Sequence, residues 1–183
     1  MRIISGKFKG KKINLPKDNL TRPLRDIIKE SIFNILNHSN LLKIKLEKAN
    51  ILDLFSGTGS FGLECISRGA GYVTFFENYE PAVKVLIKNI NILNCSYKTN
   101  IYRKNVFDAN LKQLGKFDII FLDPPFKYKD IGKLISNLKY ENILNKNGII
   151  VYHNHKSHSD NLPKNFKIIK QLNHGISRIY FGS

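Results

Sequence analysis

The sequence has no tryptophan, two cysteines and one methionine, and it contains no run of eighteen apolar residues that would span a membrane. Cys65 and Cys95 lie thirty positions apart, without the spacing of metal ligands, so we expect two reduced thiols rather than a disulfide or a zinc site. The N-terminal residues lack the apolar stretch of a signal peptide. These absences predict a cytoplasmic protein without membrane association and without a bound metal.

Acidic residues are also few, because 14 Asp and Glu stand against 30 Lys and Arg, and the formal net charge is +16. Bases that neutralise phosphates supply most sequence-independent affinity for nucleic acid, so this excess favours a polyanionic partner. A genome with biased base composition would also enrich lysine, so position is the better criterion. Residues 1–25 contain one acid, Asp18, among many bases. We predict RNA contacts, rather than a merely solvated face, for Arg2, Lys7, Lys9, Lys11, Lys12, Arg22 and Arg25.

The length and the order of the sequence patterns predict a single domain. Residues 1–40 form a basic N-terminal extension, in which β-type runs at 2–4 and 12–15 predict a hairpin. A helix with Pro23 in its first turn follows the hairpin. The remaining residues, 41–183, form the core of the domain.

Segments typical of strands and helices alternate in that core, which predicts an α/β fold with a doubly wound, mostly parallel sheet of seven strands. The predicted strands are residues 49–54, 71–77, 100–104, 117–122, 148–153, 166–172 and 177–181. The predicted helices are residues 60–68, 81–93 and 131–144.

A glycine-rich turn follows the first predicted strand, in the sequence Asp53-Leu54-Phe55-Ser56-Gly57-Thr58-Gly59. Its glycines let the backbone turn tightly and approach a ligand, and the next helix presents its N-terminus to an anionic group. Glu77, at the end of the second predicted strand, is placed to accept hydrogen bonds from ribose hydroxyls. The pattern predicts a binding site for a nucleoside-type cofactor.

Residues Gly57 to Gly62 also satisfy the G-x-G-x-x-G pattern of dinucleotide-binding proteins. Two observations favour S-adenosylmethionine over NAD. Asp53, four residues before the first glycine, would repel a pyrophosphate but would orient the amino group of a methionine moiety. The chain is also too short for a dinucleotide domain together with a substrate domain. A tight turn that binds no ligand is the remaining alternative.

The second motif is Asp123-Pro124-Pro125-Phe126, which follows the apolar run of residues 117–122. Consecutive prolines cannot continue a central strand, because neither donates a ladder hydrogen bond, so the chain leaves the sheet at Asp123. A carboxylate, the Pro124 carbonyl and the ring of Phe126 then meet at one point. This group is suited to grip the exocyclic amino group of a nucleobase, and we predict these three residues to be catalytic.

With these motifs the chain resembles the RsmD family, class I S-adenosylmethionine-dependent methyltransferases that modify N2 of one guanine in 16S ribosomal RNA. The basic leader, Thr21-Arg22-Pro23 and Ser67-Arg68-Gly69-Ala70 also match the family's pattern. The resemblance implies S-adenosylmethionine as cofactor, 16S RNA within an assembled small ribosomal subunit as partner, and a monomer. It implies cofactor contacts from Asp53, Phe55, Ser56, Gly57, Gly59, Glu77, Asn105 and Asp123.

Two positions depart from that pattern. Asn105 stands where the family usually has an aspartate that contacts the adenine amino group, and its amide oxygen can still accept that hydrogen bond. Near the fifth predicted strand, Tyr152 beside His153 replaces the usual acidic residue, a change to which the sequence assigns no consequence.

The sequence leaves two alternative functions open. A DNA adenine-N6 methyltransferase uses the same amino-group chemistry, although the chain has no inserted target-recognition domain. A non-catalytic RNA-binding or assembly protein would keep the fold alone. His153, His155 and His158 form a histidine-rich segment, which we interpret as a surface loop rather than a metal site because it lacks a clear acidic or cysteine partner.

Overall fold

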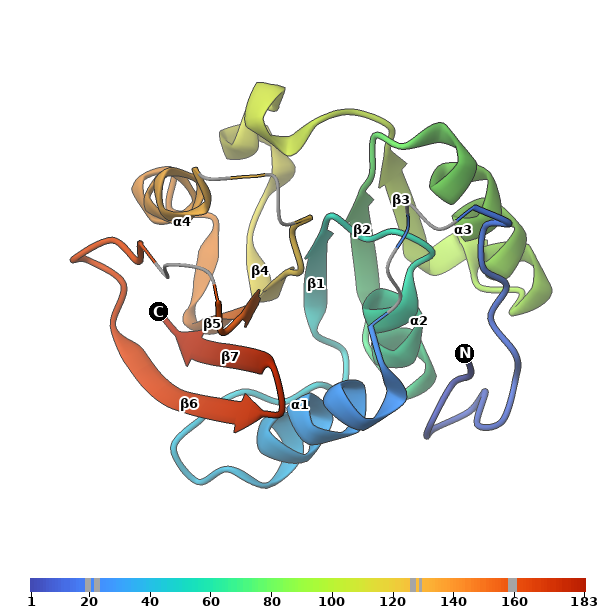
Figure 1. Ribbon diagram of the computed structural model, residues 1–183, viewed down its shortest axis with the longest axis horizontal. Helices are drawn as coiled ribbons and strands as arrows, with labels where there is room; N and C mark the ends of the chain where they lie inside the picture. The colour runs from blue at the N-terminus through green and yellow to red at the C-terminus, as the bar shows by residue number, and fades with distance from the viewer. Residues whose placement is uncertain (19–20, 22–23, 126–127, 129, 158–160) are drawn as a thin grey trace.

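The computed structural model describes residues 1–18, 21, 24–125, 128, 130–157 and 161–183. Its centre is a seven-stranded sheet in the order β3-β2-β1-β4-β5-β7-β6, in which β7 runs antiparallel to both of its neighbours (Figure 1). The strands are β1 Asn50–Leu54, β2 Tyr72–Phe76, β3 Thr99–Tyr102, β4 Phe117–Leu122, β5 Leu144–His155, β6 Ile168–His174 and β7 Ser177–Gly182. The predicted fold class is therefore confirmed.

Four α-helices and three short 3₁₀ helices connect the strands within the described residues. The helices are α1 Asp26–His38, α2 Ser60–Ser67, α3 Glu80–Ile92 and α4 Ile131–Tyr140, with 3₁₀ turns at Ser96–Lys98, Val106–Asp108 and Leu111–Leu114. None of these described helices is long and apolar enough to cross a lipid bilayer. The predicted helix 131–144 was too long, because Asn142 adopts a left-handed φ of 51° that ends α4, and Leu144 already begins β5.

Alternate residues of each parallel strand face opposite sides of the sheet and pack into two separate apolar clusters. Ile51 and Ile119 belong to the cluster beneath α1, α2 and α3, whereas Leu52 and Ile120 belong to the cluster beneath α4. Both faces are thus covered by helices (Figure 1), as a parallel sheet requires. This periodicity places Asp53, which lies between Leu52 and Leu54, on the face covered by α2.

Strand β1 lies between β2 and β4 and is parallel to both. The chain that leaves β1 continues into α2 on one face, and the chain that leaves β4 leads to α4 on the other. The carboxyl ends of β1 and β4 therefore diverge around a crevice. In open α/β sheets this crevice is the usual place for a ligand.

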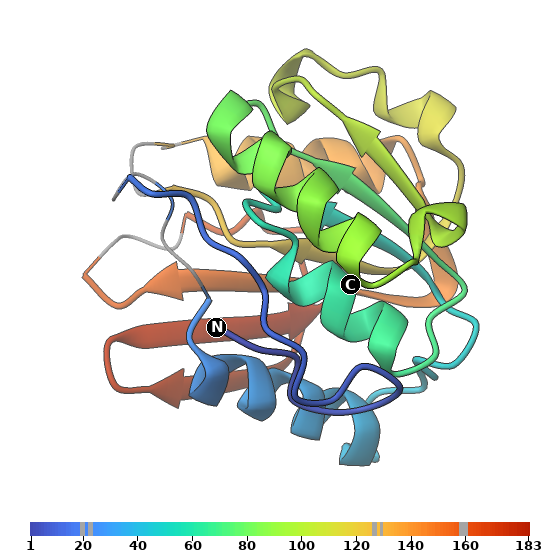
Figure 2. The ribbon, with the colours of Figure 1, turned by 90° about the vertical axis from the view of Figure 1, so that its right-hand side faces the viewer.

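The N-terminal extension contains less β-structure than predicted. Arg2 and Lys12 form an isolated antiparallel bridge, flanked by hydrogen bonds from Ile3 N to Lys11 O (2.9 Å) and from Ile13 N to Met1 O (3.0 Å). Ile3 and Ile13 are buried in the same cluster as the sheet and α1. Figure 2 shows this segment, in dark blue, running along α2. Pro23 lies outside the described residues, and the division of the domain at residue 40 stays a prediction.

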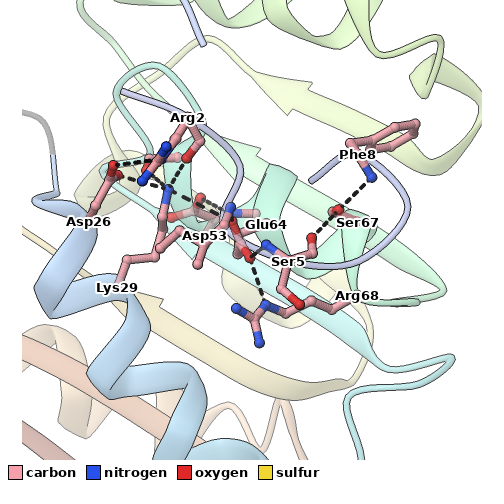
Figure 3. Close-up of polar contacts among 12 residues, drawn as sticks. Arg2, Ser5, Phe8, Asp26, Lys29, Asp53, Glu64, Ser67 and Arg68 are labelled. Atoms are coloured by element: carbon pink, nitrogen blue, oxygen red, sulfur yellow. Dashed lines mark hydrogen bonds and ion pairs between the residues drawn. The ribbon is translucent and has the colours of Figure 1, made fainter. Parts of the chain in front are cut away.

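The carboxylate of Glu64, in the middle of α2, anchors the extension (Figure 3). It accepts hydrogen bonds from the backbone N–H groups of Ile4 (2.7 Å) and Ser5 (3.0 Å), and from Arg68 Nε (2.7 Å). Lys29 Nζ, from α1, lies 3.8 Å from Glu64 and donates to Arg2 O at 2.7 Å. The Glu64 and Lys29 side chains are both completely buried. Burial lowers the pKa of Lys29, and the negative charge of Glu64 opposes that shift.

We expect Lys29→Met to lower the free energy of unfolding by about 1–3 kcal/mol, because Glu64 keeps Arg68 but loses its cationic partner on α1, and Arg2 O loses its donor. Urea denaturation followed by circular dichroism measures the change. Glu30→Gln, at an exposed position of the same helix, is the matched control. A Lys29→Met protein as stable as the control would contradict this role.

Candidate active site

A cavity of about 610 Å³ opens at the carboxyl ends of β1 and β4. Its walls come from the glycine-rich turn, from the ends of β2, β4 and β5, and from the chain before and within α1. It brings together most of the described residues that the two sequence motifs predicted. The lining includes Asp53, Phe55, Ser56, Gly57, Glu77, Asp123, Pro124, Arg25 and His153.

Asp53, one residue before the end of β1, is almost fully buried, with an exposed fraction of 1%. Its Oδ2 accepts one hydrogen bond, from Gly62 N in α2 at 3.0 Å. Burial raises the pKa of the Asp53 carboxyl well above its usual range; the Gly62 N–H opposes the shift, and the nearby Asp123 and Glu77 carboxylates add to it. A cationic ligand group at this point would relieve the energetic cost of the buried charge.

Glu77 ties the glycine-rich turn to the end of β2. Its Oε2 accepts the N–H of Gly57 at 2.7 Å, and its Oε1 accepts those of Asn78 (2.9 Å) and Tyr79 (2.8 Å). A carboxylate has about four lone-pair positions, so one remains for a ligand hydroxyl. Glu77 therefore shapes the turn as well as lining the cavity, a structural role that the sequence motif did not indicate.

The turn itself requires glycine. Gly57 and Gly59 have φ values of 54° and 82°, and a Cβ on Gly59 would lie 2.4 Å from Leu86 Cδ1. Gly59 also stands immediately before α2, at the N-cap position. A helix N-terminus favours an anionic ligand group, and the binding of such a group here stays a prediction.

Asn89 of α3 connects the glycine-rich turn to the extension. Its Nδ2 donates to Thr58 O at 3.1 Å and to Asn14 O at 3.2 Å, and its Oδ1 accepts Asn14 N at 2.9 Å. The side chain is buried. A move of the extension would therefore disturb the turn, a coupling that no local sequence signal indicated.

Phe55 and Tyr128 line one side of the cavity, and Phe107 packs against both of them. The ring of Tyr128 lies 5.4 Å from those of Phe55 and Phe107, measured between ring centroids. Asn105 lies beside them and uses its Oδ1 to accept Phe107 N at 3.2 Å, so it caps a 3₁₀ turn in addition to lining a small recess with Phe55 and Glu77. Its predicted contact with an adenine amino group stays a prediction. Tyr128 and Phe107 were not identified from the sequence, because neither belongs to a motif.

Asp123 and Pro124 lie where the chain leaves β4, as predicted, and both line the cavity. Asp123 Oδ1 lies 2.8 Å from His153 Nδ1, and His153 Nε2 lies 2.9 Å from Ser177 Oγ. The third predicted catalytic residue, Phe126, lies outside the described residues. The neighbouring Tyr152 is buried against Tyr180 of β7, with 6.2 Å between ring centroids, so it belongs to the core.

The histidine segment was wrongly interpreted as a surface loop. His153 and His155 belong to β5, which extends two residues beyond its predicted end, and both line the cavity. Pairing with β7 up to Ser177 explains this extension of the strand. The described residues hold no cluster of three or more His, Cys, Asp or Glu side chains able to bind a metal. His158 lies outside the part of the chain that the structure describes.

The predicted RNA-binding bases do not form one patch beside the cavity. Arg25 lines it, and Arg2 lies near the start of α1, 3.9 Å from Asp26. Lys7 instead lies at the far end of α2, where its backbone N–H donates to Ser67 O at 2.7 Å. The eight residues of α2 span about 12 Å. Lys9, Lys11 and Lys12 are exposed in the same extension, and Arg22 lies outside the described residues.

Comparisons with known proteins identify relatives of this chain. The sequence model of the family described as Conserved hypothetical protein 95 matches residues 1–183. The chain is 33% identical over 180 residues to "Ribosomal RNA small subunit methyltransferase D" of Haemophilus influenzae. This match covers 96% of this chain and 90% of that protein. It is 34% identical over 170 residues to the Buchnera aphidicola protein of the same name, covering 92% and 85%. A solved structure, "Putative methyltransferase yhhF from Escherichia coli", matches with a TM-score of 0.84 at 27% identity, covering 100% of this chain and 96% of that chain.

We expect Asp53→Asn to stabilise the protein without ligand, by about 1–3 kcal/mol at pH 8, because an amide keeps the bond to Gly62 N without a buried charge. A carboxyl whose pKa is raised by folding loses its stabilising contribution as pH rises from its unfolded pKa through its folded pKa. The advantage of the variant should therefore shrink toward acidic pH. Urea denaturation across this range measures it, with the exposed Asp108→Asn as control. A difference that does not change with pH would contradict the raised pKa.

Proposed function

Because this chain belongs to the RsmD family of ribosomal RNA methyltransferases, we propose that it transfers a methyl group from S-adenosylmethionine to the exocyclic N2 of a guanine in 16S ribosomal RNA. One observation carries the proposal. The buried Asp53 carboxylate and the Asp123-Pro124 pair line one cavity from adjacent strands, so a cofactor site and an amino-group site meet there.

The residues around the cavity fit S-adenosylmethionine. Asp53 would bind the ammonium group of the methionine moiety, the N-terminus of α2 its carboxylate, and Glu77 the ribose hydroxyls. The cofactor, when bound, supplies an electrophilic methyl group on a sulfonium sulfur. The buried charge of Asp53 disfavours the pyrophosphate of NAD in the same place.

Asp123 and Pro124 would hold the nucleophile. The lone pair of a guanine amino nitrogen is delocalised into the ring, so the site must favour the pyramidal nitrogen that carries developing positive charge. A carboxylate oxygen of Asp123 and the Pro124 carbonyl would accept its two N–H bonds and stabilise that charge, an effect that reaches several kcal/mol in a site without water. The predicted stacking on Phe126 would add orientation.

The target atom of a base in RNA is usually paired or stacked, so we infer that the guanine is turned out of its helix to enter the cavity. Arg25, at the cavity wall, would meet the backbone next to the target nucleotide, and the lysines at the far end of α2 would meet phosphates farther along. This separation favours a structured substrate, such as an assembled small subunit, over a short single strand. Such a substrate belongs to the cytoplasm.

The rival substrate is adenine N6 in DNA, because the same acceptor pair would serve it. A protein that only binds RNA is the second rival. Methyl transfer from labelled S-adenosylmethionine to unmodified small subunits, free 16S RNA and DNA, followed by nucleoside analysis, separates all three. N2-methylguanine in RNA supports the proposal; N6-methyladenine in DNA, or no label in any of them, overturns it.

We expect Asp123→Ala to lower kcat roughly 100-fold or more, because it removes a preorganised acceptor of the developing charge. Single-turnover methylation of small subunits measures the rate. Asp130→Asn, which changes an exposed carboxylate paired with Lys133, is the matched control and should keep the normal rate. Normal turnover by Asp123→Ala would refute the assignment of this site.

We expect the combined change Lys7→Gln, Lys9→Gln and Lys11→Gln to weaken RNA binding and to flatten its dependence on salt, by about 0.7 in the logarithmic slope for each phosphate that the protein no longer neutralises. Affinity for S-adenosylmethionine should stay unchanged, because none of these lysines lines the cavity. Filter binding at several salt concentrations measures the slope. Glutamine at the exposed Lys112, Lys116 and Lys146 is the control for net charge. Equal slopes for the two triple variants would mean that the lysines of the extension only solubilise the surface.

A further inference from the structure

His153 is the one described side chain that forms a hydrogen bond with the carboxylate of Asp123. The imidazole bridges two strands, since its Nδ1 lies 2.8 Å from Asp123 Oδ1 after β4 and its Nε2 lies 2.9 Å from Ser177 Oγ at the start of β7. The side chains of His153 and Asp123 are 18% and 25% exposed, so the contact lies at the cavity wall, partly shielded from water.

The chemistry of these groups determines the direction of the bonds. An ionised carboxylate only accepts hydrogen bonds, so the proton between the two side chains belongs to Nδ1. Ser177 can donate to Nε2 or accept from it, and in either case it restrains the ring at its other end. Ser177 is itself nearly buried and sits in the paired part of β7, so this restraint comes from the sheet rather than from a loop.

The bond to His153 occupies one oxygen of the Asp123 carboxylate and leaves the second oxygen available. With Oδ1 held by His153, rotation of the Asp123 side chain is restricted, and Oδ2 makes no hydrogen bond to another group within the described chain. One oxygen is thus restrained by the protein, and the other is left for the substrate. A held acceptor needs no reorganisation as positive charge develops on the amino nitrogen.

We propose that His153 is a positioning residue for methyl transfer, which fixes the Asp123 carboxylate through Nδ1 while Ser177 fixes the imidazole through Nε2. The proposal rests on the proposed function for its catalytic consequence, but not for its structural part. His155, two residues along the same strand, has a different contact: its Nδ1 lies 2.6 Å from Ser157 Oγ. The assignment is therefore specific to His153.

The structural part is tested on the wild-type protein without RNA or cofactor. Nitrogen NMR of the imidazole rings, with His153 assigned by its disappearance in His153→Asn, reports which ring nitrogen carries a proton. We expect a protonated Nδ1 whose proton exchanges slowly with water, and faster exchange in Asp123→Ala. An Nδ1 without a proton, or exchange that Asp123→Ala does not change, overturns the proposal. This result does not depend on which nucleic acid is methylated.

The catalytic part is tested by a pair of variants on whichever substrate the wild type methylates. His153→Leu removes the hydrogen-bond donor to Asp123. His153→Asn keeps a donor, because its Nδ2 lies near the position of the imidazole Nδ1. We expect kcat to fall roughly 10- to 100-fold in His153→Leu, as for a misplaced catalytic group, with unchanged affinity for S-adenosylmethionine by calorimetry. His153→Asn should recover most of the rate. His38→Asn, at the exposed end of α1, is the control.

Two further outcomes decide whether His153 acts through Asp123. In an Asp123→Ala background, His153→Leu should cause no additional loss of rate, because the group that it positions is absent. Ser177→Ala should lower kcat when it is introduced into the wild type. In a His153→Asn background it should leave kcat unchanged, because the shorter asparagine side chain does not reach β7. Equal impairment of the leucine and asparagine variants, or additive losses in the Asp123→Ala background, would show that His153 has a different role.

Discussion

The parallel pairing of β1 with β4 is the constraint on which the site depends. Leu54 pairs with Leu122, so the glycine-rich turn and the Asp-Pro-Pro segment leave the sheet at the same level. Their chains then continue to opposite faces, toward α2 and α4. The divergence opens the cavity, and it brings the Asp53 and Asp123 carboxylates, one from each motif, to the same cavity. All further geometry, including the contribution of β5 and β7, is added around this pair of strand ends.

Two buried carboxylates, Glu64 within α2 and Asp53 on the strand beneath it, serve opposite purposes. Glu64 is surrounded by donors, from two backbone N–H groups, Arg68 and Lys29, and this compensation lets it hold the extension in place. Asp53 accepts one hydrogen bond from the residues that the structure describes, and the cost of its burial raises its pKa. Perturbed ionisation of this kind is common where a ligand supplies the missing partner. Glu64 thus stabilises the fold, whereas the buried Asp53 next to the cavity destabilises it.

The N-terminal extension runs along α2 and is joined to the glycine-rich turn at the cavity. Glu64 and Ser67 hold it along α2, and Asn89 joins it to the glycine-rich turn. Because Arg25 follows in the same segment and lines the cavity, a substrate that binds the extension acts on a wall of the site itself. The exposed Lys7 lies at the end of α2 away from the cavity, so the proposed nucleic-acid contact there and the proposed chemistry are separated by the length of a helix.

The sequence by itself determined the fold class, the glycine-rich turn and the Asp-Pro-Pro segment, because each follows from local rules: alternation of apolar residues, positive φ at glycine and the missing N–H of proline. Only the tertiary structure decided which residues meet those motifs. His153 reaches Asp123, and Ser177 reaches His153, because β5 extends to His155 and pairs with β7, a contact between strands that are distant in sequence. The far placement of Lys7 and the bonds of Glu64 have the same origin. Contacts of this kind depend on register and packing, which no short pattern of residues records.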